Sequence, residues 1–319
     1  MSLDAYRRAA DNRAPGTPPV CTVILRCKNS AYEIGPALAA LFSQEFRDFE
    51  LLVIDSGSTD NTLEIVAAFP HRLIRIAPAE YVPGRVLNRG IAENASPLCV
   101  FLNSDCVLLT PQALGRLVGA FADPAVMAAF ARQVARPEAW SWVRREYLAS
   151  FPVEGAAPPW IELSLPFAAM RRSAWEEQPF YDEAWGSEDT AWGHRARQRG
   201  WTVRYVPDAL VMHSHNYTLK QLYGRRFIEG EADSFIYGNA YRPLRIARRA
   251  LGQTLRDWVA AIRDGSFGEL PQAPIRRLVD ALGYLKGAHH GARRIQAGLA
   301  DISHGQQVVL DRHVSKRSS

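Results

Sequence analysis

Residues 51–62 read LLVIDSGSTDNT, an apolar run that ends abruptly in a carboxylate and a series of small polar residues. Four consecutive apolar residues, Leu51 to Ile54, predict a strand that is covered on both faces, as in a parallel sheet. Ser58 and Thr59 are residue types that cap helices, so we predict a helix from about Thr59 to Phe69. A strand, a polar turn and a helix in this order are typical of one unit of an α/β fold.

Similar units surround this one. Apolar runs at 22–25, 73–76 and 98–102 predict three more strands, and helical spacing of apolar residues between 34 and 42 predicts a helix. The second half adds predicted strands at 126–130, 163–170 and 201–206, predicted helices at 140–148 and 187–199, and helices after 217. The pattern predicts an α/β protein with a mostly parallel mixed sheet. Ligands bind beyond the carboxyl ends of strands in such sheets, so the residues that follow each strand are candidate site residues.

The composition is that of a globular protein. Of the 319 residues, 47% are hydrophobic and 22% are charged, which excludes collagen-like, disordered and disulfide-scaffold classes. No uncharged apolar run is long enough for a membrane-spanning helix, and the N-terminal residues lack the apolar core of a signal peptide. The four cysteines have no CxxC spacing, so we interpret them as buried thiols and expect a cytoplasmic protein.

Positive charge is concentrated in the C-terminal quarter of the chain. Residues 241–319 hold 14 Lys and Arg against 6 Asp and Glu, whereas the first 240 residues hold 24 against 27. This imbalance predicts an anionic neighbour, either a membrane surface or a phosphorylated substrate. The alternative is that the arginines coat solvated helix faces. No nucleic-acid-binding motif occurs, so we expect no nucleic-acid partner.

Four polar stretches carry the candidate chemistry. Asp55 and the hydroxyl groups after it suit hydrogen bonding to a base or a ribose. Asp105, which follows the run LCVFLNS, offers an oxygen ligand for Mg²⁺ or Mn²⁺, and Asp189 in the first turn of a predicted helix can act as a general base. A capping or turn role is the alternative for all three carboxylates. In VMHSHN, an extended backbone would direct His213 and His215 to the same side, and a structural role is the alternative for this pair.

In this order and spacing, these stretches resemble the family 2 glycosyltransferases of the GT-A fold. The resemblance rests on VIDSGSTDNT, on the strand that ends in LNSD and on GSEDTAW, and it covers about residues 20–238. ILRCKNS, PGRVLNRG and HSHNYTLKQLYGRRF are similar to a bacterial branch labelled rhamnosyltransferase-like. The resemblance implies a Rossmann-like nucleotide-diphospho-sugar transferase domain at 20–240. We expect a flexible segment at 1–19 before this domain and a basic helical region at 241–319 after it.

The resemblance also implies roles for individual residues. Asp189 matches the family's general base, with Glu188 beside it. Asp105 matches the metal ligand of an Asp-x-Asp motif whose first position is Asn103 here, a change that implies weaker metal binding. His213 matches a further metal or diphosphate ligand, with His215 as the alternative. The residues that match the family's donor pocket are Arg26, Lys28, Asn29, Asp55, Ser56, Arg85, Asn88 and Asn103, with Ser56 in place of a usual second Asp.

These roles imply an inverting glycosyltransferase that uses Mg²⁺ or Mn²⁺. It would move a sugar from a nucleoside-diphosphate sugar to a hydroxyl of a glycan or lipid-linked acceptor in bacterial surface polysaccharide synthesis. The basic C-terminal helices add an expected contact with the inner face of an anionic membrane. Packing of these helices onto the catalytic domain or onto a second subunit is the alternative. One alternative is a catalytically silent binding protein of the same fold, indicated by Asn103. Another is a sugar-phosphate nucleotidyltransferase, which would need a Gly-rich signature that ILRCKNS lacks.

Overall fold

The computed structural model describes residues 6, 13–14, 16–238 and 241–298. Most of the expected N-terminal segment 1–19 and residues 299–319 of the basic C-terminal region lie outside the described residues. The chain divides into two compact units. The first comprises residues up to 139, 144–180 and 189–214, and the second comprises 140–143, 181–188 and the residues from 215 onward. The β-sheet lies in the first unit, and three long helices lie in the second.

The first unit is built on one mixed sheet of eight strands in the order β3-β2-β1-β4-β7-β6-β8-β5. β3, β2, β1 and β4 run parallel, β7 is antiparallel to β4 and β6, β8 is parallel to β6, and β5 is antiparallel to β8. This confirms the predicted mostly parallel mixed sheet, and it brings the carboxyl ends of β1, β2 and β4 to one edge. The strand bounds are β1 (Cys21–Cys27), β2 (Phe49–Asp55), β3 (Arg72–Arg75), β4 (Leu98–Asn103), β5 (Val107–Leu108), β6 (Val126–Val134), β7 (Phe167–Arg171) and β8 (Thr202–Met212).

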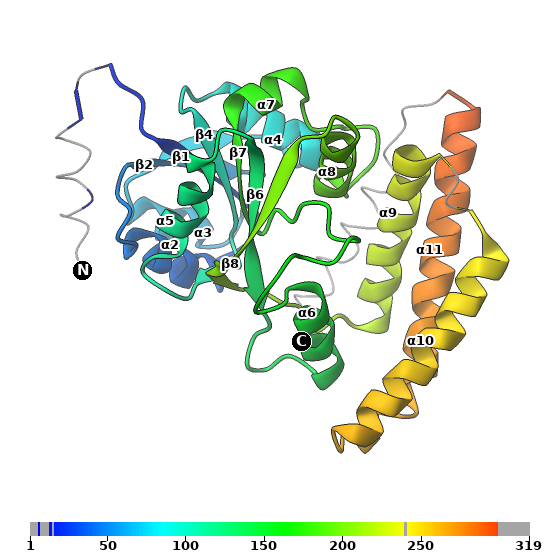
Figure 1. Cartoon of the computed structure of the whole chain (residues 1–319). Helices are drawn as coiled ribbons and strands as arrows, with labels where there is room; N and C mark the ends of the chain where they lie inside the picture. Colours follow the sequence, from blue (N-terminus) through cyan, green and yellow to red (C-terminus); the bar gives the residue numbers. More distant parts are fainter. Residues whose placement is uncertain (1–5, 7–12, 15, 239–240, 299–319) are drawn as a thin grey trace. The chain divides into compact units, whose positions relative to one another are not determined.

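Helices cover both faces of this sheet (Figure 1). α2 (Ile34–Phe42), α3 (Thr62–Ala67) and α5 (Ala113–Gly119) pack into one hydrophobic core. α4 (Pro83–Ala92), α7 (Arg172–Glu177) and α8 (Glu188–Gln198) pack into the other. Apolar side chains of β1 serve both cores in alternation, as the unbroken apolar run predicts. The remaining short elements are η1 (Pro78–Glu80), η2 (Ala120–Ala122) and α6 (Ser141–Ser150), and the first residues of α6 belong to the second unit.

The predicted start of α3 is wrong. The helix begins at Thr62 and not at Thr59, and no side chain caps it. The two predicted capping hydroxyls are used elsewhere, because Ser58 bonds to Asp55 and Thr59 bonds to Asn29. A polar turn at the edge of a parallel sheet can thus hold the ends of strands together instead of starting a helix.

Two predicted strand boundaries are also wrong. β7 begins at Phe167 and not at 163, because the N–H of Leu165 bonds to Asp189 of the helix α8 and Pro166 has no N–H to donate to a neighbouring strand. β8 does not end before Pro207 but continues to Met212. The pairing of β6 with β8 shifts register between Ala131 and Arg132, and Pro207 lies in that irregularity, where its missing N–H breaks no ladder bond.

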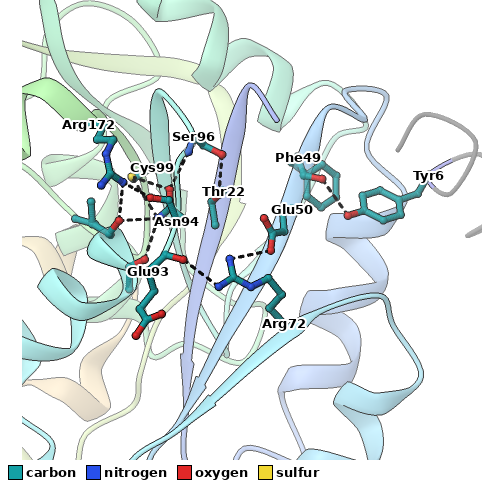
Figure 2. Close-up of polar contacts among 12 residues, drawn as sticks. Tyr6, Thr22, Phe49, Glu50, Arg72, Glu93, Asn94, Ser96, Cys99 and Arg172 are labelled. Carbon is teal, nitrogen blue, oxygen red and sulfur yellow. Dashed lines mark hydrogen bonds and ion pairs between the residues drawn. The ribbon is translucent and has the colours of Figure 1, made fainter. Parts of the chain in front are cut away.

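Polar contacts fix the amino-terminal edge of the sheet, opposite the candidate site (Figure 2). The hydroxyl groups of Thr22 and Ser96 lie 2.8 Å apart and join the starts of β1 and β4. Arg172 donates to the carbonyl oxygens of Ile91, at 2.7 Å, and Asn94. Further contacts join Arg72 to Glu50 and to the carbonyl of Glu93, and the Tyr6 hydroxyl to the carbonyl of Phe49. Buried or partly buried hydrogen bonds of this kind favour one register of the strands.

The second unit is helical, with α9 (Leu219–Tyr237), α10 (Pro243–Arg263), η3 (Phe267–Glu269) and α11 (Gln272–Gln296). α9 falls inside the transferase domain expected at 20–240, but it packs here along α11. The two helices approach closely at glycines, because a Cβ atom on Gly287 would overlap the carbonyl oxygen of Phe227. Glu231 and Arg294 form a buried ion pair of 2.7 Å between them. Among the described residues, no helix combines the length and the apolar character needed to cross a membrane.

Candidate active site

Asp55, at the end of β2, organises the loop that follows it. Its buried carboxylate accepts hydrogen bonds from the backbone N–H groups of Gly57 and Ser58, both at 3.1 Å, and from the Ser58 hydroxyl at 2.5 Å. The Cys27 thiol also donates, at 3.7 Å, and both burial and the neighbouring Asp55 raise the pKa of this thiol, which keeps it protonated. Gly57 has φ +84°, which favours glycine. Together, these contacts hold residues 55–58 in one conformation.

Asn29 joins the end of β1 to this loop. Its side-chain oxygen accepts a hydrogen bond from the backbone N–H of Thr59 at 2.8 Å, and its own N–H donates to the Ser58 hydroxyl at 2.9 Å. It has φ +48°, a left-handed conformation that asparagine tolerates better than most residues. The hydroxyl groups of Ser30 and Ser104 lie 3.1 Å apart, which links the same segment to the end of β4. The ends of three parallel strands are therefore hydrogen-bonded to one another.

Asp105 and His213 lie side by side beyond β4 and β8. Oδ2 of Asp105 is 3.8 Å from Nε2 of His213, and the His213 ring is buried. Nδ1 of His213 is 2.8 Å from Oε1 of Gln133, whose amide nitrogen donates to the Ser164 hydroxyl at 2.7 Å. Since the Gln133 nitrogen faces Ser164, its oxygen faces the histidine and accepts the Nδ1 proton. In the neutral ring, Nε2 then carries a lone pair on the side of Asp105, the orientation found in ligating histidines.

Cys106 completes the only group of this kind among the residues that the structure describes. One ligand atom from each of Asp105, Cys106 and His213 lies within 4.8 Å of the others. Cys106 is fully buried, and burial raises the pKa of its thiol. The Tyr147 hydroxyl lies 3.4 Å from Nδ1 of His213. The arrangement offers an oxygen and a nitrogen ligand at the edge of the sheet, together with a buried sulfur atom.

Asp189 is the second residue of α8 and is half-buried. Its Oδ1 accepts a hydrogen bond from the backbone N–H of Thr190 at 2.8 Å, and its Oδ2 accepts one from the backbone N–H of Leu165 at 3.4 Å. A carboxylate in the first turn of a helix is also favoured by the helix dipole. These contacts fix the position of the side chain.

Residues 164–166 connect these groups. Ser164 accepts from Gln133, which orients His213, and Leu165 donates to Asp189. The carbonyl oxygen of Pro166 accepts from the backbone N–H of Asn103 at 3.0 Å, two residues before Asp105. Three consecutive residues thus contact the end of β6, the start of α8 and the end of β4. The predicted carboxylates Asp105 and Asp189 are thereby placed around one short segment.

Asn103, which replaces the first Asp of the expected metal motif, is the residue of β4 that this segment contacts. In the sheet, it lies opposite Arg26 of β1. Arg26 in turn donates from Nη1 to the carbonyl of Pro83 at 3.4 Å. Two of the predicted donor-binding residues are therefore neighbours at the strand ends.

Four further predicted residues lie in different surroundings. Ser56 is buried, and both its N–H and its hydroxyl donate to the carbonyl of Cys27, at 3.1 and 3.3 Å. Lys28 is half-buried between Cys27 and Asn29. Glu188 is buried and belongs to the second unit, as does His215, whose ring stacks on Tyr217 at 5.2 Å.

Two predicted residues lie on α4. Arg85 is exposed. Asn88 donates from its amide to the carbonyl of Phe180 at 2.8 Å and accepts from the indole N–H of Trp175 at 2.8 Å and the N–H of Phe180 at 2.9 Å. These three bonds fix the backbone at Phe180.

Gln133 and Ser164 were not predicted from the sequence. A glutamine inside a strand and a serine in a loop belong to no motif, and their roles depend on contacts between residues 31 positions apart. The one available signal is that Gln133 follows the apolar run of β6 at its carboxyl end, where ligand-binding residues gather.

The fold matches solved glycosyltransferase structures. A mannosyltransferase, PcManGT from Pyrobaculum calidifontis in complex with GDP-Man and Mn²⁺, superposes with a TM-score of 0.61 at 19% identity, covering 91% of this chain and 94% of that one. TarS 1-349 of S. aureus in complex with UDP superposes with a TM-score of 0.51 at 16% identity, covering 87% and 91%. At these identities, the likeness shows the GT-A fold alone.

Sequence comparison gives the family. The O-antigen chain rhamnosyltransferase WbaN of Salmonella anatum is 30% identical over 193 residues, which span 57% of this chain and 61% of WbaN. RfbN of Salmonella typhimurium, also an O-antigen chain rhamnosyltransferase, is 28% identical over 66% of this chain and 71% of its own length. The family model described as glycosyl transferase family 2 matches residues 22–181, half of the chain. The chain therefore belongs to glycosyl transferase family 2, as its strand-end motifs predicted.

Proposed function

We propose that this protein is an inverting glycosyltransferase of bacterial surface polysaccharide synthesis. The proposal rests chiefly on residues 164–166, whose contacts hold the Asp189 carboxylate and the imidazole of His213 close to one segment, with Asp105 beside the histidine. A general base and a pair of ligand atoms at one strand edge are the groups that sugar transfer requires. The similarity to two O-antigen chain rhamnosyltransferases supports a polysaccharide product.

We assign the donor, a nucleoside-diphosphate sugar, to the ends of β1, β2 and β4. The hydrogen bonds among Asp55, Ser58 and Asn29 hold this edge in one conformation before a ligand arrives, which lowers the entropy cost of binding. Arg26 and Lys28 bring positive charge to the same edge, where diphosphate oxygens can accept their hydrogen bonds.

Asp105 and His213 fit a divalent cation. One carboxylate oxygen and one imidazole nitrogen lie close together, and Gln133 holds the histidine in the ligating orientation. An oxygen and a nitrogen donor suit Mn²⁺ better than Mg²⁺, which prefers oxygen ligands alone. A cation bound there would supply positive charge to the diphosphate leaving group.

In the proposed reaction, Asp189 accepts the proton of the acceptor hydroxyl. The hydroxyl oxygen forms a bond to the anomeric carbon while the bond from that carbon to the diphosphate oxygen breaks, and the nucleoside diphosphate leaves with the electron pair. A single displacement of this kind inverts the configuration. The N–H groups of Thr190 and Leu165 hold the Asp189 carboxylate in place, and Arg26 and Lys28 donate hydrogen bonds to the departing diphosphate.

The proposed function is tested by turnover. Purified protein with Mn²⁺ should release nucleoside diphosphate from at least one nucleoside-diphosphate sugar. A thermal-shift screen of nucleoside diphosphates identifies the base, because a ligand that binds only the folded state raises the melting temperature. The second candidate, a silent binding protein, is favoured by Asn103 alone. A silent binding protein would show a thermal shift with a donor but would not turn that donor over, even when extracts that contain the acceptor are added.

Replacement of Asp105 by alanine should weaken metal-dependent donor binding. The change removes the oxygen ligand and leaves His213, so we expect the Mn²⁺ concentration for half-maximal stabilisation of the nucleotide complex to rise roughly tenfold or more. The measurement is a Mn²⁺ titration of the melting temperature at fixed nucleoside diphosphate. Asp208→Ala, at an exposed position of β8, is the control. Superimposable titration curves for Asp105→Ala and the wild-type protein would remove Asp105 from the metal site.

We further propose that the helical unit contacts an anionic membrane that presents a lipid-linked acceptor. α10 exposes a stripe of large apolar side chains at helical spacing, with basic residues at its border. The stripe comprises Leu244, Leu251, Leu255, Val259 and Ile262, and the exposed basic residues beside it are Arg248, Arg256 and Arg263.

This surface predicts binding to vesicles. The protein should co-sediment with phosphatidylcholine vesicles that contain phosphatidylglycerol at low salt, and less so with phosphatidylcholine alone, because charge and apolar area act together. The double variant Leu251→Ser/Leu255→Ser should lose this binding while keeping its helix content by circular dichroism. Absence of the wild-type protein from the vesicle pellet would contradict the membrane proposal and leave the transfer reaction unaffected.

A further inference from the structure

The described part of the helical unit contains a basic pocket formed by α9, α10 and α11. Its volume is about 360 Å³, which falls within the range of roughly 300–1,000 Å³ that is typical of small-molecule sites. Five arginines line it, together with one carboxylate, Asp280. The arginines are Arg226, Arg242, Arg245, Arg249 and Arg277.

Two of these arginines are neutralised by the protein itself. Arg226 forms an ion pair with Glu229 and a second with Asp280 at 3.0 Å. Arg277 pairs with Asp257 at 2.8 Å. Although burial opposes ionisation, Arg226 lowers the pKa of Glu229 to about 2, so this pair is charged at neutral pH. These contacts build the wall of the pocket, and because Arg225 and Arg276 also pair with Glu229 and Asp257, the wall carries no excess of negative charge.

The other three arginines form no ion pair of this kind with a described residue, although Arg249 is near enough to Asp233 to oppose the rise that burial causes in the pKa of that carboxyl. Arg242, Arg245 and Arg249 are exposed, and no hydrogen bond or ion pair joins them to another residue that the structure describes. Arg245 and Arg249 are four residues apart and lie on one face of α10, and Arg242 precedes its first turn as the N-cap residue. That first turn contains no acidic residue. Positive charge at a helix N-terminus is unfavourable, and neighbouring like charges repel one another. An anion at this place would relieve both effects.

We propose that this pocket binds the phosphate group of an anionic ligand. Guanidinium groups bind phosphate oxygens through paired hydrogen bonds. Arg242, Arg245 and Arg249 supply positive charge that the ion-paired walls of the pocket do not supply. Ile246 and Ala250 give the pocket an apolar side against which an organic group can pack. The hydroxyl of Tyr284 is already bonded to Asp233, at 2.6 Å, so the arginines are the donors for the ligand. This proposal does not depend on the transfer reaction.

The test compares two triple variants of equal charge. Arg242→Gln/Arg245→Gln/Arg249→Gln removes the three exposed pocket arginines, and Lys220→Gln/Lys286→Gln/Arg293→Gln removes three exposed cations of the helical unit that do not line the pocket. Inorganic phosphate and hexyl phosphate are titrated calorimetrically with a chelator present, so that binding through a metal does not contribute. We expect the pocket variant to bind roughly tenfold or more weakly than the wild-type protein, and the control variant to bind like it. Circular dichroism establishes that both variants keep their helices.

The two probes separate the sources of the phosphate. Tighter binding of hexyl phosphate than of inorganic phosphate supports a phosphate that is carried on an apolar chain, and equal binding supports a free or nucleotide phosphate. If the two triple variants lost the same phosphate affinity, binding would be explained by general charge attraction and the proposal would be overturned. It would also be overturned if neither probe bound the wild-type protein.

Discussion

Asp189→Asn should abolish sugar transfer while donor binding persists. The amide cannot accept the proton of the acceptor hydroxyl, and loss of a general base typically lowers the rate by about 10²- to 10⁴-fold. The donor is assigned to the ends of β1, β2 and β4, and Asp189 lies at the start of α8. The measurements are the single-turnover rate of transfer and the thermal shift produced by the donor nucleotide with Mn²⁺.

This variant has one structural side effect that the controls address. The two carboxylate oxygens of Asp189 accept hydrogen bonds from two backbone N–H groups, those of Thr190 and Leu165, so an amide directs its NH₂ against one of them. Asp189→Glu keeps a carboxylate and should retain measurable transfer, and Asp208→Asn, at an exposed position, should transfer at the wild-type rate. Wild-type rates in Asp189→Asn would exclude Asp189 as the base. Loss of the donor-induced thermal shift would instead assign it to binding.

Gly287→Ala should strongly destabilise the helical unit. A Cβ atom there would overlap the carbonyl oxygen of Phe227, so α9 and α11 must move apart along a contact that also buries the Glu231–Arg294 pair. Overpacking of this kind costs about 1–3 kcal/mol or more, and weakening a buried ion pair adds to that cost. Chemical denaturation followed by circular dichroism measures the loss.

Gly252→Ala is the matched control for this prediction. The substitution is the same and also lies inside a helix, α10, but no heavy atom lies within 4 Å of the added Cβ. Alanine in a helix interior is favoured over glycine by about 0.5–1 kcal/mol, so this variant should be unchanged or slightly more stable. If the two variants unfolded at the same denaturant concentration, the close packing of α9 on α11 would be contradicted.

The sheet was predictable from the sequence because its signal is local. The runs at 51–54 and 98–102 are apolar without alternation, which only a strand covered on both faces requires, and the structure contains β2 and β4 at these positions. The start of α3 was not predictable in this way. Ser58 and Thr59 have the same preference for a helix cap as for a strand-end turn, and the choice depends on Asn29, 30 residues away from Thr59.

The candidate site was predicted only in part for the same reason. Asp105 and Asp189 belong to short motifs, whereas the contacts that bring them to one place run through Gln133 and through residues 164–166, which have no motif. The stretch 163–166 is apolar enough to predict a strand, yet β7 begins only at Phe167, because the N–H of Leu165 bonds to Asp189 of α8 and Pro166 has no N–H. The close packing of α9 on α11 at glycines was not predictable either, because the sequence does not show which helix lies against a glycine.

The contacts of Ser164, Leu165 and Pro166 limit the insertions and deletions that this segment can tolerate. Because each of the three contacts a different element, inserting or deleting one residue among them would displace the histidine support, the carboxylate of α8 and the end of β4 together. Changes in chain length are therefore expected outside this segment, while the spacing from Ser164 to Phe167 stays constant.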